Sequence, residues 1–470
     1  MVFSSLIFLL LFFVLNMLTL FVLRDVRSRN IALLVFSLIF YAWGGIGGLS
    51  LLILLAVINW FCGVNLEPHG KHRQRTWLIL GVGADVAALV IARFWYLLPG
   101  HSADSITARY VLPMGLAFYT LQLIAYLVDV YRGDTKPQRS FYQVLLYASL
   151  FHQSAGGPVL RYESIRKEFT ARKVKAGELS RGTMRFAAGL AKKVILADSC
   201  GVVVLKLVGQ STESVRQAPV LALWMGAVFF MLELYLDLSA YADMAIGMGL
   251  MCGFHYPENF DYPYMAASLR DFWHRWNMTV VSFFKDYVYA PLGGKSLGAG
   301  VGILNLAVTW LLFGLWNGGR ANFLLWALWC LAMLLIEHYL LHDLEKLPSA
   351  VGHIWVLLTV LIGFVFFYFT DLGMLGAALK GLIGLNGAGF TSEAVGAVLK
   401  QHLLLLILAV IGVTPACRIA GNAVTQGAKA RRELLYLKAV WEAVMPALLI
   451  FLSILAMIGE RAPAFLYFQL

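Results

Sequence analysis

Charged residues are scarce in this sequence. Only 13% of its 470 residues are charged and 60% are hydrophobic, with a mean hydropathy of +0.76. Soluble domains carry about 25% charged residues. Long polar stretches are also missing: the longest, about 161–182, is too short to build a core of its own. These absences exclude a soluble protein and predict one polytopic membrane domain over residues 1–470.

The sequence also lacks the common motifs of soluble enzymes and metal sites. Its five cysteines stand singly without a C-x-x-C pair, which argues against a disulfide framework or a zinc–cysteine site. It has no serine nucleophile elbow and no P-loop. His338 and His342 are four residues apart but lack the H-E-x-x-H order. We therefore expect no metal site.

Acidic residues are fewer than basic ones, 26 against 37, and the densest basic stretch is 161–193. Because no nucleic-acid recognition motif accompanies this charge, we expect no nucleic-acid partner. Basic loops beside apolar segments instead set membrane topology and attract anionic lipid heads. The lipid bilayer is therefore the first predicted partner.

Apolar runs near the length needed to cross a bilayer recur along the whole chain. We expect about ten to twelve transmembrane helices, with some re-entrant and interfacial helices in addition. The clearest runs are 4–23, 77–98, 111–128, 219–236, 321–341, 354–370, 402–418 and 440–458, and shorter or glycine-broken runs lie at 31–43, 49–64, 140–160, 183–209, 238–254 and 301–316.

The distribution of arginine and lysine predicts the orientation of the chain. No basic residue precedes the first apolar run and no cleavage site follows it, so we do not expect a signal peptide. The first charges, in 24–30, come after that run, and two further basic loops, 67–76 and 131–139, follow at intervals of two spans. The positive-inside rule then places residue 1 outside and these three loops in the cytoplasm.

Polar residues alternate with apolar ones between Glu233 and Asp243, and this run includes Asp237, Ser239 and Tyr241. In a soluble protein such alternation indicates a strand. In membrane context we expect helix ends that meet at a polar core, because polar groups held between membrane helices are costly and usually functional.

The stretch 268–289 has an aromatic side that includes Trp276 and a charged side that includes Asp271 and Arg275. This pattern predicts one interfacial amphipathic helix with its aromatic rings at the lipid headgroups. His274 precedes Asn277 by three residues, so on one helix the two side chains share a face.

The apolar run 301–316 ends in G-L-W-N-G-G-R, and a new run begins near Ala321. Asn317, which follows Trp316, therefore lies at a predicted helix break. A helix break leaves backbone N–H groups that can stabilise a developing negative charge on oxygen. The alternative is that Asn317 is only a helix cap, for which asparagine is a favoured residue.

Several ordered motifs together resemble the membrane-bound O-acyltransferase (MBOAT) family, and most closely its bacterial alginate O-acetylation branch. The resemblance covers nearly the whole chain, with the motif-bearing core at about 112–330. It rests on the motifs L-P-M-G-L-A-F-Y-T-L-Q (112–122), A-Y-L-V-D-V-Y-R-G (125–133), G-G-P-V-L-R-Y (156–162), Y-L-D-L-S-A-Y-A-D-M-A-I-G (235–247), P-E-N-F-D-Y-P-Y (257–264), D-F-W-H-R-W-N-M-T (271–279) and F-G-L-W-N-G-G (313–319).

The resemblance implies a ring of membrane helices around a central funnel, in the bacterial inner membrane. It implies transfer of an acyl group from a cytoplasmic donor, acetyl-CoA or another acyl thioester, to an exported polysaccharide, with no bound cofactor. The basic stretch 161–193 could then form a cleft for an anionic donor. The implied partners are a periplasmic acetyltransferase or the proteins of polysaccharide synthesis and export.

This sequence departs from the family at the two positions that matter most for chemistry. The family's principal catalytic histidine corresponds to Asn317 and its second histidine to Asn277. The residues that would support them are Trp316, Trp276, Asp271, Arg275, His274, Asp237, Ser239 and Tyr241.

An amide can donate a hydrogen bond to an oxyanion but cannot act as a base. Losing general-base help costs about 10²–10⁴ in rate, and His274 is a candidate displaced base. Two functions therefore stay open: an acyltransferase that works through donor activation and hydrogen-bond donors, or a non-catalytic scaffold of a polysaccharide secretion complex. An ordinary transporter would leave the motifs unexplained.

Overall fold

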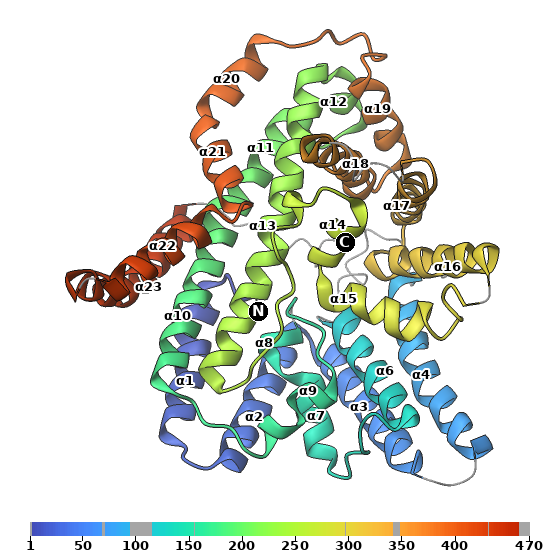
Figure 1. The fold of residues 1–470 in the computed structure, drawn as a ribbon, viewed down its shortest axis with the longest axis vertical. Coiled ribbons are helices and arrows are strands. Elements are labelled where there is room, and N and C mark those ends of the chain that lie inside the picture. Colours follow the sequence, from blue (N-terminus) through green and yellow to red (C-terminus); the bar gives the residue numbers. More distant parts are fainter. Residues whose placement is uncertain are drawn as a thin grey trace. The chain divides into compact units, whose positions relative to one another are not determined.

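The protein is built from helices joined by turns and loops. The computed structural model describes residues 2–67, 71–94, 115–154, 156–296, 298–341, 348–430 and 432–459, and it contains no strand within these ranges. Eight of the described helices are long and apolar enough to cross a membrane, or nine if the bent pair α20–α21 is counted as one span. The predicted all-α polytopic fold is therefore confirmed (Figure 1).

Within the described ranges, fewer long spans are found than the ten to twelve expected of the whole chain, because several apolar runs form short helices. The run 140–160 contains α7 (Phe141–Ser149) and α8 (Phe151–Ser154), which are nine and four residues long. The helices of the first apolar run, η1 and α1, form only a short apolar helix, Phe8–Val22. Such segments need neighbouring protein to cover their ends.

The residues group into two compact units, each assembled from separate stretches of chain. Unit 1 comprises Met1–Phe186, Tyr241–Glu258 and Lys285–Tyr287, and unit 2 comprises Ala187–Ala240, Asn259–Phe284 and Val288–Leu470. Neither unit is one contiguous segment, so the expectation of a single membrane domain stays a prediction.

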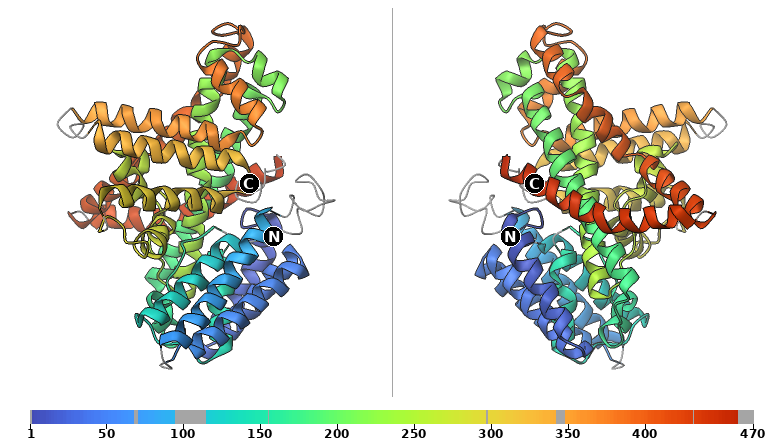
Figure 2. Two further views of the ribbon diagram at one scale, coloured as in Figure 1. Left: turned by 90° about the vertical axis from the view of Figure 1, so that its right-hand side faces the viewer. Right: turned by 90° about the vertical axis from the view of Figure 1, so that its left-hand side faces the viewer.

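Unit 1 packs its first long helices against one another, and α3 contacts α2, α4, α6 and α7 (Figure 2). Its interior contains a group of phenylalanine rings that includes Phe8, Phe40 and Phe151, all at most 1% exposed. The described elements of unit 1 before α10 are η1 (Phe8–Phe12), α1 (Phe13–Val22), α2 (Val26–Gly44), α3 (Ile46–Asn65), α4 (Lys71–Phe94), α6 (Leu116–Arg132), α7, α8, α9 (Tyr162–Ile165) and η3 (Arg166–Phe169).

Unit 2 contains most of the residues that the sequence singles out. Within it, α16 packs on α17 and α17 on α18. Its described elements are η4 (Lys192–Ala197), α11 (Asp198–Val208), α12 (Thr212–Gln217), η5 (Pro263–Met265), α14 (Leu269–Arg275), α15 (Met278–Phe283), α16 (Ala299–Asn317), α17 (Ala321–Tyr339), α18 (Ser349–Tyr368), α19 (Leu372–Leu382), α20 (Glu393–Gln401), α21 (Leu403–Gly412), α22 (Ala416–Ala430) and α23 (Arg432–Gly459).

Three elements contribute residues to both units: α10 (Ala176–Ala191), α13 (Val220–Cys252) and η6 (Phe284–Tyr289). The alternating run 233–243 lies in the middle of α13, which is 33 residues long and uninterrupted. The expectation that helix ends meet at this run is therefore wrong. On a helix, alternate residues point in directions about 200° apart, so the polar side chains of the run spread around α13 instead of forming one face.

Candidate functional site

Asn277 lies at a break between two short helices of unit 2. The backbone of Asn277 is left-handed, with φ 44° and ψ 50°, and separates α14 from α15. Left-handed backbone is unfavourable for most residues but is tolerated by asparagine. The expectation of one continuous helix over 268–289 is therefore wrong: the segment folds as α14, α15 and the π-helix η6.

Asn259, from the loop that carries P-E-N-F-D-Y-P-Y, holds this break together. Its Nδ2 donates to Oδ1 of Asn277 at 3.0 Å, and its own Oδ1 accepts from the N–H and the hydroxyl of Thr279 at 3.1 and 2.8 Å. Its main-chain carbonyl accepts from the N–H of Met278 at 2.9 Å. Asn259 and Asn277 are 3% and 4% exposed, so these are buried contacts in which each polar atom needs a partner.

Trp276 lies inside a cluster of rings and not at a membrane surface. Its ring is 5.3 Å from both Phe260 and Phe364 and 5.5 Å from Phe272, measured between centroids. Phe272 and Trp276 are 0% and 4% exposed. The predicted aromatic face at the headgroups is therefore wrong, because these rings form the interior of unit 2.

The charged residues of α14 are arranged as expected for a surface. Asp271 and Arg275 form an i,i+4 ion pair at 2.9 Å, and the hydrogen bond from Arg275 to Asp271 raises the pKa of the guanidinium. His274 is exposed. Because α14 ends at Arg275, His274 and Asn277 are not on one helix, and the predicted shared face is wrong. His274 therefore does not reach Asn277 along a shared helix, as a replacement base at that position would need.

Asn317 is the last residue of α16 and is 2% exposed. Its Nδ2 donates to the carbonyl of Phe313, one turn earlier, at 2.8 Å. The predicted helix break is confirmed, since α16 ends at Asn317 and α17 begins at Ala321. The amide thus bonds back to a carbonyl four residues earlier, which holds the side chain against its own helix.

Glycine is required where the chain leaves α16. The added Cβ of any other residue at Gly318 would lie 2.0 Å from the ring of Phe323, and one at Gly314 would lie 2.7 Å from the carbonyl oxygen of Phe323. Real Cβ atoms do not approach other atoms so closely, so the G-x-x-x-G spacing around Trp316 lets the first turn of α17 lie against the end of α16. This contact fixes the backbone on both sides of Asn317.

Aromatic contacts connect the neighbourhoods of the two asparagines. Phe284, which follows α15, lies 5.1 Å from Phe313 and 6.3 Å from Trp316 on α16. Trp273 on α14 lies 6.2 Å from Phe313. The break at Asn277 and the end of α16 thus belong to one aromatic core. Both asparagines are buried, as a functional site requires, and their opening into one shared cavity stays a prediction.

The predicted polar residues of α13 divide between the two units. The ammonium nitrogen of Lys193 forms ion pairs with two carboxylates. It lies 2.9 Å from Oδ1 of Asp237 and 2.6 Å from Oδ1 of Asp198. All three side chains are at most 5% exposed. The hydroxyl oxygen of Ser239 accepts a hydrogen bond from the ammonium group of Lys192 at 3.3 Å. The lysines come from the π-helix η4, a rare geometry that frequently marks functional sites.

Tyr241, by contrast, lies in unit 1, where its ring stacks on that of Phe3 with 5.6 Å between centroids. Sequence reasoning placed Tyr241 beside Asp237 and Ser239 because the three alternate in the chain. It missed Asn259, Lys193 and Asp198, and the one sequence signal for them was the presence of polar residues inside motifs or apolar runs.

Some basic residues of the stretch 161–193 form ion pairs with acidic residues outside it. In unit 1, Arg161 pairs with Asp286, and Arg185 pairs with Asp243 at 3.0 Å. These pairs give part of the stretch a structural role, and both its attraction to anionic lipid heads and a donor cleft stay predictions. Among the described residues, no three His, Cys, Asp or Glu side chains gather as a metal site would need. His342 and residues 112–114 lie outside the described residues.

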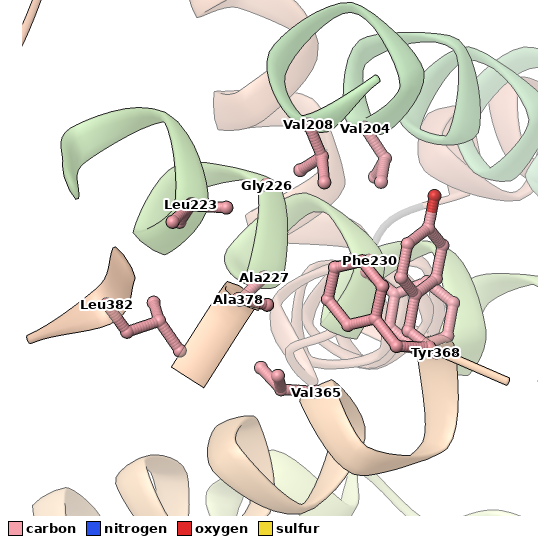
Figure 3. A pocket seen from close by; sticks show the side chains of 11 residues that line it. Val204, Val208, Leu223, Gly226, Ala227, Phe230, Val365, Tyr368, Ala378 and Leu382 are labelled. Atoms are coloured by element: carbon pink, nitrogen blue, oxygen red, sulfur yellow. The ribbon is translucent and has the colours of Figure 1, made fainter. Parts of the chain in front are cut away.

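Unit 2 also has an apolar cavity between α11, α13, α18 and α19 (Figure 3). Aliphatic side chains such as Val204 and Leu382 line it, together with the rings of Phe230 and Tyr368, which are 4.7 Å apart. A second cavity is lined by residues of α14, α17 and α18. Neither Asn277 nor Asn317 lines either of these two cavities. The two cavities are therefore apolar spaces apart from the two asparagines.

Comparison with known proteins decides the family. The model of the membrane-bound O-acyltransferase family matches residues 138–375, about half of the chain. Over the full length of both proteins, the chain is 34% identical to a probable alginate O-acetylase of Pseudomonas putida. The chain belongs to the membrane-bound O-acyltransferase family. The matched part of this MBOAT protein contains Asn277, Asn317 and every other predicted site residue.

Two other relatives of this MBOAT protein are more distant. A peptidoglycan O-acetyltransferase of Helicobacter pylori is 29% identical over 75% of this chain and 73% of its own length. A teichoic acid D-alanyltransferase of Bacillus subtilis is 21% identical over 52% of this chain and 64% of its own length. The predicted family, with its polysaccharide O-acetylating branch, is therefore confirmed.

Proposed function

We propose that this MBOAT protein is a membrane O-acyltransferase of an exported-polysaccharide acylation system, and that the group it transfers is acetyl. The observation that carries the proposal is the match over full length to a probable alginate O-acetylase. A match of the whole chain includes the spans as well as the motifs, so it favours a shared reaction over a borrowed fold. The chain would act in the inner membrane with its N-terminus outside.

The reaction joins an acyl thioester to a hydroxyl group. The hydroxyl oxygen bonds to the acyl carbon, the carbon–sulfur bond breaks, and the hydroxyl proton ends on the thiol. We assign the donor as acetyl-CoA or another acyl thioester on the cytoplasmic side, with the acyl group passed across the membrane. A periplasmic acetyltransferase, or proteins of polysaccharide synthesis and export, would receive the product.

Asn317 and Asn277 would act in this reaction as hydrogen-bond donors. A carboxamide next to the acyl carbonyl stabilises the negative oxygen that forms during attack. Asn317 is suited to this role because its amide is buried and fixed by the carbonyl of Phe313. Without a histidine base, the hydroxyl must lose its proton to the leaving thiolate or to water, which makes the reaction slower than with histidine.

The alternative is a catalytically impaired protein that serves as a scaffold or assembly subunit of the secretion complex. One observation favours it: both amides already have structural tasks. Asn277 provides the left-handed turn and its Oδ1 accepts a hydrogen bond from Asn259, and the amide of Asn317 donates to the carbonyl of Phe313 in its own helix. A residue kept for such contacts does not need to take part in chemistry.

Deletion of the gene from its own strain separates the two functions. Acetyl content and yield of the exported polymer are measured in the deletion strain, and again after the intact chain is returned. The acyltransferase proposal expects acetyl content to fall and yield to persist. Loss of polymer yield or export, with normal acetyl content in the remaining polymer, would contradict it and support the scaffold.

A direct assay supplies the second line of evidence. The protein in proteoliposomes is given radiolabelled acetyl-CoA on one side and an oligosaccharide acceptor on the other, and release of free thiol and labelled glycan is followed. The acyltransferase proposal expects both products in equal amounts. The Asn422→Ala variant, which changes an exposed asparagine of α22, is the matched control and should retain the wild-type rate.

A further inference from the structure

Asp85 is an acidic residue buried in the middle of a membrane span in unit 1. It lies on α4, 13 residues after His72 and nine residues before Phe94, which are the two ends of that span. At 1.5 Å per residue it is about 20 Å and about 13 Å from those ends. Its side chain is 0% exposed, while Val86 and Val90 of the same helix are 45% and 50% exposed. Asp85 therefore faces protein and not lipid or water.

The partner of Asp85 is an uncharged amide. Asn59 on α3 donates from Nδ2 to Oδ1 of Asp85 at 3.0 Å and to the carbonyl of Leu55 at 2.9 Å. Both hydrogens of this amide are thus used. Within the described ranges, Oδ2 of Asp85 and Oδ1 of Asn59 are buried oxygens without a hydrogen-bond partner. The pair has two acceptors left over and no donor, and a proton on the carboxyl group would supply the missing donor.

The surroundings contain no described cation that could balance a negative charge. The titratable groups that face Asp85 are the thiol of Cys62 on α3 and the hydroxyl of Tyr119 on α6, and Tyr41 on α2 lies behind Tyr119 with 6.3 Å between ring centroids. Arg93, on the same helix as Asp85, is eight residues away, or about 12 Å along the axis. Asp237 in unit 2 is different, because the ammonium of Lys193 contacts it at 2.9 Å.

A carboxylate with no cation in an apolar interior is very costly, and such a group takes up a proton instead. We propose that Asp85 is a proton-binding site inside the membrane, with a carboxyl group that is neutral at ordinary pH and that is a site of modification by apolar carbodiimides. This inference does not depend on acyl transfer. It would also hold for a scaffold.

Dicyclohexylcarbodiimide tests the proposal because it reacts with protonated carboxyl groups in apolar places. The carboxyl proton moves to a nitrogen of the reagent, and the carboxyl oxygen bonds to its central carbon. The acyl group then migrates to nitrogen, so the whole reagent is added and nothing leaves. We expect the adduct on Asp85, at least about tenfold above Asp237, when the full-length protein in lipid is labelled near pH 6.5 and analysed by peptide mass spectrometry.

Three controls make the labelling decisive. Asp85→Asn should remove the adduct. A water-soluble carbodiimide with an added amine should modify exposed carboxylates such as Glu393 and leave Asp85 untouched. Labelling of Asp85 should weaken as pH rises. Absence of the apolar adduct on Asp85, or modification of Asp85 by the water-soluble reagent, would overturn the proposal.

Thermal stability gives a second measurement that does not need the reagent to reach Asp85. Asparagine has nearly the shape of a protonated aspartic acid, so near pH 6 Asp85→Asn should unfold at a temperature no lower than the wild type, and at a higher one because the unfolded wild type releases a proton that the variant does not have. Because the folded state keeps a proton that the unfolded state releases, raising the pH to about 9 should destabilise the wild type more than Asp85→Asn. A large loss of stability in Asp85→Asn near pH 6, or an equal pH response of both proteins, would show that the native group is charged.

Discussion

Asn259 and Asn277 form a buried amide pair that fixes the break between α14 and α15. The Nδ2 of Asn259 donates to Oδ1 of Asn277 at 3.0 Å, and Asn277 adopts φ 44°. The position that the family resemblance assigns to a histidine is therefore also a position of unusual backbone. Asparagine and histidine are both enriched in left-handed backbone, so this conformation accommodates either residue.

The backbone of Asn277 gives the first prediction. Alanine and glycine both remove the contact with Asn259, but glycine adopts a positive φ without strain. Asn277→Gly should therefore be more stable than Asn277→Ala by about 1 kcal/mol. At Asn422, inside the helix α22, the alanine variant should instead be more stable than the glycine variant, by a similar amount. The measurement is the unfolding temperature of each variant in detergent. The same order at both positions would contradict a left-handed Asn277.

The buried ion group of unit 2 gives the second prediction. Lys193→Met leaves Asp198 and Asp237 without their cation, and breaking such a group costs about 3–5 kcal/mol. The triple variant Lys193→Met, Asp198→Asn, Asp237→Asn removes all three charges and should recover most of this loss. Lys206→Met, which changes an exposed lysine of α11, is the control and should be neutral. Thermal unfolding in detergent measures all three. Equal losses in the single and triple variants would show that charge pairing is not the cause.

Orientation in the membrane gives the third prediction. Cysteines placed at Arg27 and Lys71 should resist a thiol reagent that cannot cross the membrane when it is added from outside, because the positive-inside rule places both in the cytoplasm. A cysteine at Glu213, in the exposed segment between α11 and α13, should react, because the positive-inside rule also places the basic stretch 161–182 in the cytoplasm and the apolar run 183–209 predicts one crossing between them. Labelling is compared in intact and permeabilised cells in a background without Cys417, which is exposed. The opposite pattern would invert the topology.

Apolar runs predicted the long helices because hydrophobicity over about 20 residues is a strong local signal. The runs at 321–341 and 354–370 correspond to α17 and α18, and 219–236 is the first part of α13. The helix break after Asn317 was also predictable, because two glycines follow it. Family membership followed from ordered motifs and needed no structure.

Other features could not be predicted because they depend on contacts between distant residues. The break at Asn277 rests on Asn259, which is 18 residues earlier in the chain and bonds to it through side chains. The rings of Phe272 and Trp276 have the composition of an interfacial face, but the rings that surround them come from other elements. Lys193 resembles a topology signal in the sequence and becomes part of a buried ion group only when α13 packs beside η4.

The central claim is that buried Asn317 takes part in acyl transfer as a hydrogen-bond donor. Asn317→Ala removes the donor and should abolish acetylation. Asn317→His, alone or with Asn277→His, restores a base and should raise the rate by up to about 10²–10⁴. Asn422→Ala should match the wild type, and protein level and polymer yield must be equal in all strains for the comparison to hold.

The most direct measurement is therefore the acetyl content of the exported polymer in strains that carry wild type, Asn317→Ala or Asn317→His. The account predicts acetyl content near that of the deletion strain for Asn317→Ala and above wild type for Asn317→His. Unchanged acetyl content in Asn317→Ala, at normal protein level and polymer yield, would contradict it.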